Sequence, residues 1–205
     1  SAMRSTSDST AATTIDTPST TTTGETVSST VRLWRLMSSA LALPSVSASH
    51  DVIETILDLP AAVARYLDAQ GEARALCLPP DPRLSGCDWS GFALHQDAAP
   101  DEAATLAIAR KGIAETGSLV FETSPQAPML PNFLTLHHLV LLRVADIAPW
   151  LEEAPLAGPQ PRAHYWITGV SGTTDIEGTY VRGAHGPRFL HVILLRGDFP
   201  HMSEQ

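Results

Sequence analysis

The residues best suited to chemistry stand near the C-terminal end of the 205-residue chain, between Ile167 and Glu177. This stretch is typical of a strand, a loop of Gly, Ser and Thr, and the start of a helix. Thr174 and Glu177 have the spacing of a capping box, in which the hydroxyl and the carboxylate satisfy free N–H groups of a helix start. A helix entered in this way also offers backbone N–H groups to an anion. Ser171, Thr173 and Thr174 are therefore candidate ligand-binding residues, and a capping box without a ligand is the alternative.

A second group of candidates precedes the last apolar segment, Phe189–Leu195. Glycines flank His185, so the backbone can approach a ligand closely there, and an imidazole can bind an anion or move a proton near neutral pH. We take His185 and Asp175 as candidate catalytic residues and Gly186 as a ligand contact. His191 falls inside the apolar segment and is interpreted as a core histidine.

Polar residues in the middle of the chain extend the candidate site. Glu115 precedes a buried strand and is a candidate base or nucleophile, although it could equally pair with a loop N–H. Ser124 and Asn132 follow that strand among prolines and could contact a ligand. His137 and His138 open the next strand, where alternation sends them to opposite faces, so they cannot grip one metal together. At least one of them is expected to be structural, and His138 is kept as a ligand contact.

Several kinds of site have no signature in the sequence. A Walker A loop, a Gly-x-Gly-x-x-Gly fingerprint after a strand, a His-Glu-x-x-His helix and a Gly-x-Ser-x-Gly elbow are all missing. Cys77 and Cys87 are too few and too far apart for a zinc or iron–sulfur set, and a reducing compartment favours two thiols. The sequence therefore predicts neither a metal nor a resident cofactor.

The charge and the hydropathy pattern limit the partners. A formal net charge of −9 argues against a nucleic-acid or anionic-membrane surface, because both attract Lys and Arg clusters. No run of about 18 apolar residues exists, which predicts no membrane span. The N-terminal residues lack the basic and apolar regions of a secretory signal, so we expect a cytoplasmic protein.

The periodicity of apolar residues predicts an α/β protein. Strands are expected at 74–78, 118–121, 136–144, 165–168 and 189–195, and helices at 60–70, 101–111, 146–153 and 175–181. Such strands, apolar on both faces, indicate a mostly parallel sheet covered by helices on both faces. Ligands collect at the carboxyl ends of such strands, where we expect Ser171, Thr173, Asp175, His185 and Glu115 to meet.

Three segments are expected along the chain. Residues 1–30, rich in Ser and Thr, are predicted to be a disordered tail that begins with a tag remnant, Ser1-Ala2. Residues 31–45 have the apolar spacing of an N-terminal helix, and Pro44 is its stop signal. Residues 46–205 are expected to form one α/β domain, with a proline-rich loop at 155–161.

Together these segments resemble the LUD-domain family and its LutC-like lactate utilisation members. Three stretches carry the resemblance: Gly112–Val120, Asn132–Val140 and, most specifically, Ile167–Leu194, where order and spacing both hold. Val170 departs from the family pattern, because relatives often have proline before the serine of this loop. Leu136 stands where relatives usually have an acidic residue, which puts a polar role at that position in doubt.

The resemblance implies a NagB/RpiA/CoA-transferase-like fold and a place in a system that oxidises L-lactate to pyruvate, whose iron–sulfur clusters belong to partner proteins. We therefore expect an accessory or substrate-binding subunit that takes a small anion such as lactate or pyruvate. The alternative is a stand-alone enzyme that uses a CoA thioester, a sugar phosphate or ATP, with Glu115 as its base or nucleophile. A purely structural role, with the helix near Trp34 and the tail as docking elements, is the third hypothesis.

Overall fold

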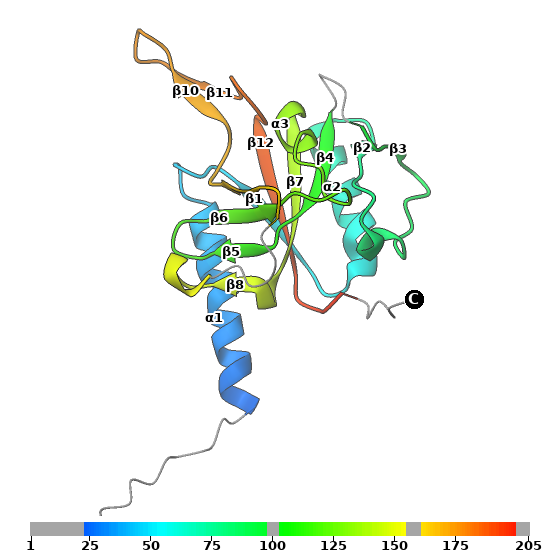
Figure 1. Ribbon diagram of the computed structural model, residues 1–205, viewed down its shortest axis with the longest axis vertical. Coiled ribbons are helices and arrows are strands. Elements are labelled where there is room, and N and C mark those ends of the chain that lie inside the picture. The colour runs from blue at the N-terminus through cyan, green and yellow to red at the C-terminus, as the bar shows by residue number, and fades with distance from the viewer. Residues whose placement is uncertain (1–22, 98–102, 155–160, 200–205) are drawn as a thin grey trace, which may run out of the picture.

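The computed structural model describes residues 23–97, 103–154 and 161–199, and a parallel sheet of six strands lies at its centre (Figure 1). The strand order is β1-β12-β7-β4-β2-β3, and every pairing in the sheet is parallel. Its strands are β1 (Ser49–Ile53), β2 (Ala75–Cys77), β3 (Ala93–His95), β4 (Ala104–Ile108), β7 (His137–Arg143) and β12 (Phe189–Leu195). Strands β7 and β12 are buried along nearly their whole length, because both faces of the sheet are covered.

Helix α2 (Leu59–Gln70) covers one face of the sheet. Pro60 suits the first helical turn, and Gly71 ends the helix in the left-handed conformation with φ +75°. The apolar stripe of α2 packs on the alternate residues of β7 and β12 that point to this face, including Leu139, Leu141 and Ile193. Short 3₁₀ helices at Ile56–Asp58 and Pro82–Leu84 complete this side.

The other face carries helix α1 (Thr23–Leu41) and a second, smaller sheet (Figure 1). The order of this sheet is β8-β5-β6-β9, with strands β5 (Lys111–Ile113), β6 (Ser118–Glu122), β8 (Ile147–Ala148) and β9 (His164–Ile167). Met37 and Leu41 of α1 pack with Phe121 of β6 on the residues of β7 and β12 that point to this side, such as Val140 and Val192. The predicted α/β class with a mostly parallel sheet is confirmed, and the small sheet is an added layer.

Two elements gather at the amino ends of β7 and β12. Helix α3 (Pro131–Leu134) leads into β7, and the antiparallel hairpin of β10 (Gly172–Thr174) and β11 (Tyr180–Arg182) projects from the body (Figure 1). In the sequence, the hairpin lies between β9 and β12. This arrangement brings α3 and both ends of the hairpin to one edge of the sheet.

Three predicted helices are wrong. Residues 101–111 contain β4, where burial between β2 and β7 outweighs the favourable placement of charges for a helix dipole. Residues 146–153 form β8 between two 3₁₀ helices, Val144–Asp146 and Leu151–Glu153. Residues 175–181 form the turn and second strand of the hairpin: Asp175 Oδ1 accepts hydrogen bonds from the N–H groups of Glu177 and Thr179, which stabilises a turn in place of a helix start.

The N-terminal helix is longer than the sequence predicts. Helix α1 begins at Thr23, before the expected residue 31, and ends at Leu41. Residues 1–22 of the predicted tail and residues 155–160 of the predicted loop lie outside the described residues. Among the helices that the structure describes, none combines the length and the apolar character needed to cross a membrane.

Candidate ligand-binding cleft

A cleft with a cavity volume of about 240 Å³ opens at the amino ends of β7 and β12. We call it the motif cleft, because most of its wall comes from the stretch that carries the family resemblance. Its lining residues are Asn132, Phe133, His138, Trp166, Ile167, Gly169, Val170, Ser171, His185, Gly186, Pro187 and Leu190. The volume suits a small metabolite, since pockets for drug-sized ligands begin at about 300 Å³.

Backbone contacts fix the wall that Ser171 occupies. Ser171 N donates to the carbonyl of Pro187 at 3.1 Å, and Gly183 N donates to the carbonyl of Ser171 at 2.7 Å. These bonds tie the two ends of the hairpin together. A Cβ built on Gly186 would lie 3.3 Å from Ser171 Oγ, so the glycine allows the close approach of the two segments.

Gly169 sets the direction of the chain as it enters the cleft. Its φ is +82°, and a Cβ there would lie 2.6 Å from the carbonyl oxygen of Val46. Val170 N donates to that same carbonyl at 3.1 Å. Glycine is therefore required for both the left-handed backbone and the space, and this contact anchors the cleft wall to the segment before β1.

His138 lies in the wall on the β7 side and has an unusual environment. Its side chain is buried, its ring centroid lies 5.7 Å from that of Phe121, and its Nε2 has no hydrogen-bond partner among the described residues. Burial lowers the pKa of His138 to about 3, so the imidazole is neutral at physiological pH. A neutral imidazole carries one donor and one acceptor nitrogen.

The other two buried histidines face α2, away from the cleft. His137 Nδ1 lies 2.9 Å from Tyr66 Oη, and His191 Nδ1 lies 2.9 Å from Ser49 Oγ. The His191 ring also stacks on Tyr66 with a centroid distance of 4.1 Å. His191 is therefore a core histidine, as interpreted from the sequence, with a hydroxyl group as its partner.

The charges around the motif cleft suit an anion. None of its lining residues is Asp or Glu. The hydroxyl of Ser171 and the imidazole of His185 supply donors for a carboxylate at the wall itself.

Half of the residues singled out in the sequence line this one cleft: Asn132, His138, Ser171, His185 and Gly186. Thr173, Thr174 and Asp175 stand on the exposed or half-exposed hairpin instead, outside the lining. Glu115 is exposed in the turn between β5 and β6, where its N–H donates to the carbonyl of Pro149 at 3.1 Å. Ser124 Oγ caps a turn after β6 by accepting from the N–H of Ala127.

The expected position at the carboxyl edge of the parallel sheet is wrong. The strand before the loop, β9, pairs antiparallel with β6 in the small sheet. It is therefore not a strand of the parallel sheet, and the rule for carboxyl ends does not apply to its loop. The predicted capping box of Thr174 and Glu177 is wrong for the same stretch, because a hairpin turn replaces the helix.

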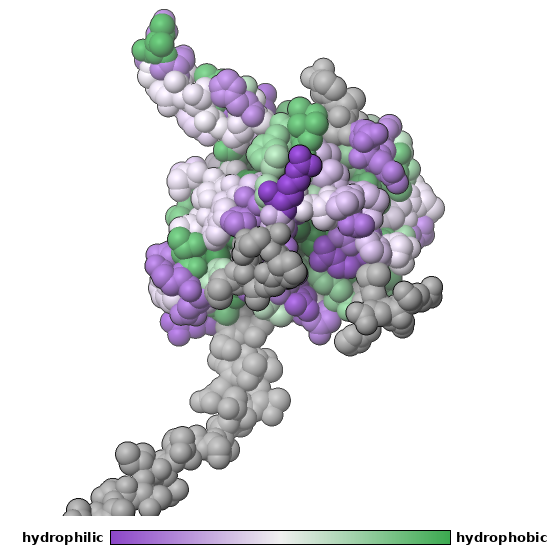
Figure 2. All heavy atoms as spheres, in the orientation of Figure 1, coloured by the Kyte–Doolittle hydropathy of each residue, from purple (hydrophilic) through white to green (hydrophobic). Residues whose placement is uncertain are grey.

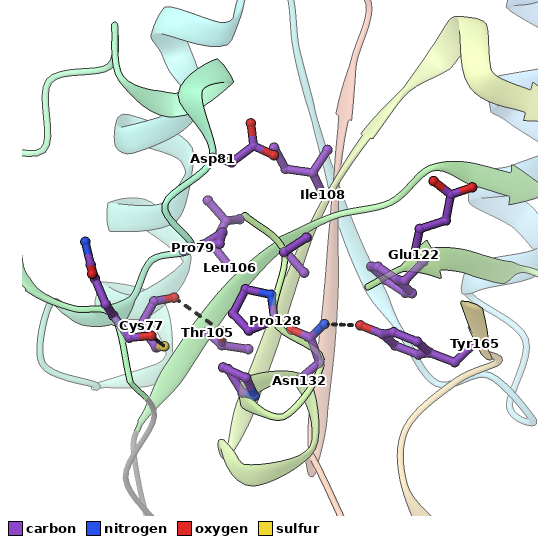
Figure 3. A pocket seen from close by; sticks show the side chains of 15 residues that line it. Cys77, Pro79, Asp81, Thr105, Leu106, Ile108, Glu122, Pro128, Asn132 and Tyr165 are labelled. Carbon is purple, nitrogen blue, oxygen red and sulfur yellow. Dashed lines mark hydrogen bonds between the residues drawn. The ribbon is translucent and has the colours of Figure 1, made fainter. Parts of the chain in front are cut away.

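A second, narrower cleft lies between the two sheets (Figure 3). Its cavity volume of about 20 Å³ leaves room for little more than a water molecule. Asn132 Nδ2 donates to Tyr165 Oη at 2.6 Å in its wall, and burial raises the pKa of the Tyr165 hydroxyl. Asp81 and Glu122 also line this inter-sheet cleft, so it is a poor site for an anion. The motif cleft is the better candidate on both volume and charge.

Sequence reasoning missed the apolar part of the motif cleft, formed by Phe133, Trp166, Val170 and Leu190. Trp166 and Leu190 belong to strands and could not be distinguished from core residues by their pattern. The prediction that Cys77 and Cys87 are thiols and not a disulfide is confirmed. Their Sγ atoms donate to the backbone carbonyls of Gln96 and Ile56, respectively.

Residues 101–195 match the LUD domain family model. The chain is 29% identical over 153 residues to Lactate utilization protein C from Deinococcus radiodurans, a match that covers 67% of this chain and 69% of that protein. It is 31% identical over 100 residues to an uncharacterized protein from Neisseria meningitidis serogroup B, covering 46% of this chain and 42% of that protein.

The fold is similar to the crystal structure of a DUF162 family protein from Deinococcus radiodurans. The TM-score is 0.59 at 18% sequence identity, and the match covers 82% of this chain and 98% of the other. The family model matches the β4–β12 region, from which every lining residue of the motif cleft comes. The resemblance read from the sequence is thereby confirmed: residues 101–195 match the LUD domain family, and the chain is similar to a lactate utilization protein.

Proposed function

We propose that this protein acts in lactate utilisation as an accessory or substrate-binding subunit, and that it holds a short carboxylate such as lactate or pyruvate in the motif cleft. The observation that carries this proposal is the location of the most specific family stretch. Ser171, His185 and Gly186, all within that stretch, meet at one cleft of small-metabolite size. The similarity to a protein named for lactate utilisation supports the choice of ligand.

The chemistry of the lining supports a carboxylate. Ser171 and His185 supply hydrogen-bond donors, and no lining carboxylate repels an anion. Ile167, Val170 and Leu190 supply apolar contacts for a short alkyl group. The stand-alone enzyme is the weaker hypothesis, because its candidate nucleophile Glu115 lies outside both clefts.

Partner proteins that carry iron–sulfur clusters complete the proposal, with the assembly in the cytoplasm. The hairpin beside the motif cleft presents large apolar side chains to solvent: Ile176 is fully exposed and Tyr180 is 60% exposed. Figure 2 shows hydrophobic atoms at the tip of this hairpin. Exposed apolar groups next to a ligand site favour a surface that is covered in an assembly.

Calorimetric titration of the purified protein with L-lactate and with pyruvate tests the ligand. We expect Ser171→Ala to weaken binding of the carboxylate about tenfold, the effect of one lost hydrogen bond to a charged group. Thr174→Ala removes a hydroxyl from the hairpin without touching the cleft and serves as the matched control. Equal affinities for the wild type and Ser171→Ala, or no binding of either acid, would contradict the proposal.

A further inference from the structure

The side chain in the motif cleft that the proposed function leaves without a role is His138. His138 is 1% exposed, lines the cleft, and has no hydrogen-bond partner for Nε2 among the described residues. A buried polar atom without a partner costs folding free energy, and such atoms are rare in native proteins. Nε2 of His137 and of His191 also lacks a hydrogen-bond partner among the described residues, but each of these rings bonds a hydroxyl through Nδ1 and neither lines the motif cleft.

We infer that the His138 imidazole is the specificity-determining residue of the motif cleft and hydrogen-bonds the oxygen on C2 of a 2-hydroxy or 2-oxo acid. This inference rests on the proposed function, because it assumes that a short carboxylate occupies the cleft. Ser171 and His185 line the same cleft from the two ends of the hairpin, whereas His138 belongs to β7. In the inferred arrangement, Ser171 and His185 hold the carboxylate group and His138 bonds the oxygen on C2.

The neutral state of the ring suits both members of the redox pair. A neutral imidazole accepts a hydrogen bond from the alcohol of a 2-hydroxy acid in one tautomer and donates one to the ketone of a 2-oxo acid in the other. Burial, which lowers the pKa of His138 to about 3, maintains this neutral form across physiological pH. A charged ring would only donate.

The size of the exposed part of the ring limits what can bind there. His138 is 1% exposed and its Nε2 is buried in the wall, so the ring suits contact with a small group rather than a bulky one. The ring of Phe121, from β6 of the small sheet, packs against the His138 imidazole, with the two ring centroids 5.7 Å apart. A ligand without an oxygen at C2, such as propionate, fills the same space but leaves the imidazole without a partner.

The test compares L-lactate, pyruvate and propionate by NMR titration with the wild type, His138→Leu and His138→Gln. We expect the wild type to bind the two oxygenated acids about five- to tenfold more tightly than propionate, the effect of one buried hydrogen bond. His138→Leu should bind all three acids alike. His138→Gln, whose amide nitrogen replaces Nε2, should restore part of the preference, which a residue of merely structural importance would not do.

The outcomes separate the inference from the proposed function. If the wild type binds neither lactate nor pyruvate, both fail. If it binds all three acids equally, or if His138→Leu keeps the wild-type preference, the role of His138 is overturned while carboxylate binding stands. Should His138→Leu not fold, His138→Asn takes its place, because its shorter amide does not reach the position of Nε2.

Discussion

His137 and His138 are consecutive residues of β7 that serve opposite faces of the parallel sheet. His137 points to α2, where its Nδ1 lies 2.9 Å from Tyr66 Oη and its ring stacks on Phe189 at 4.6 Å. His138 lines the motif cleft, and its Nε2, like that of His137, has no hydrogen-bond partner among the described residues. The pleat of the strand thus divides two identical side chains between a structural role and the proposed binding role.

This division predicts opposite effects of the same substitution on stability. His138→Leu removes a buried, unpartnered nitrogen and should leave the free energy of unfolding unchanged or raise it by about 1 kcal/mol. His137→Leu removes the partner of the Tyr66 hydroxyl and should lower that free energy by roughly 1–3 kcal/mol. Urea unfolding of the two variants measures the difference. A larger loss for His138→Leu than for His137→Leu would contradict the assignment.

The buried imidazoles also predict a loss of stability in mild acid. Burial lowers the pKa of His191 to about 4 and that of His138 to about 3, below the 6.5 of an imidazole in water. As the pH falls below about 6.5, the unfolded chain takes up protons that the folded chain does not. The stability from these groups is therefore complete above about pH 6.5 and decreases towards pH 4, by about 1.4 kcal/mol per pH unit for each imidazole.

Unfolding in urea at pH 7, 6 and 5 measures this dependence. His191→Gln should reduce the slope between pH 6 and 5 by about 1.4 kcal/mol per pH unit. His164→Gln, on an exposed position of β9, is the matched control and should keep the wild-type slope. An unchanged slope in His191→Gln would show that this imidazole is not buried in its neutral form.

Two glycines with the same backbone conformation provide a test of the cleft wall. Gly169 and Gly178 have φ values of +82° and +81°, but only Gly169 has backbone atoms close to the place of a Cβ, with Val46 O at 2.6 Å. Gly178→Ala should cost about 1 kcal/mol for the left-handed conformation alone. Gly169→Ala should cost about 3 kcal/mol and also weaken lactate binding, because it displaces the cleft wall. Thermal unfolding with and without lactate separates the two effects, and equal losses would argue against the close contact with Val46.

The sequence was sufficient for the elements whose apolar pattern is unambiguous. The buried runs that became β6, β7 and β12 were predicted nearly to the residue, and Pro60 with Gly71 located both ends of α2. The alternation rule alone was enough to place His137 and His138 on opposite faces of the sheet. The family stretch likewise brought Ser171, His185 and Gly186 into one group.

The failures have a common physical cause, which is that strand pairing is not local. β4 and a helix are both compatible with the residues of 101–111, and only the neighbours β2 and β7 decide between them. β9 has the pattern of a buried strand, but nothing within it shows that it pairs antiparallel in a second sheet. Because β9 belongs to the small sheet, the loop that follows it lies at the amino ends of β7 and β12 and not at the expected carboxyl edge of the parallel sheet.

The hairpin shows how turn chemistry can imitate a helix start. Asp175 and Thr174 are favoured at both a helix N-terminus and a tight turn, because their oxygens accept from nearby N–H groups in either case. In the fold, Asp175 Oδ1 accepts from the N–H of Thr179, and Gly178 at φ +81° closes the turn. Thr174 and Asp175 therefore lie on the exposed hairpin and do not line the motif cleft.

The most direct measurement of the central claim is growth of the host on L-lactate after deletion of the gene, in a strain without a redundant lactate dehydrogenase. We predict that growth is lost and that wild type and Thr174→Ala restore it. A Ser171→Ala/His185→Ala double variant that folds normally should not restore it, because both changed side chains line the motif cleft. Unchanged growth of the deletion strain, or full rescue by the double variant, would contradict a role of the motif cleft in lactate utilisation.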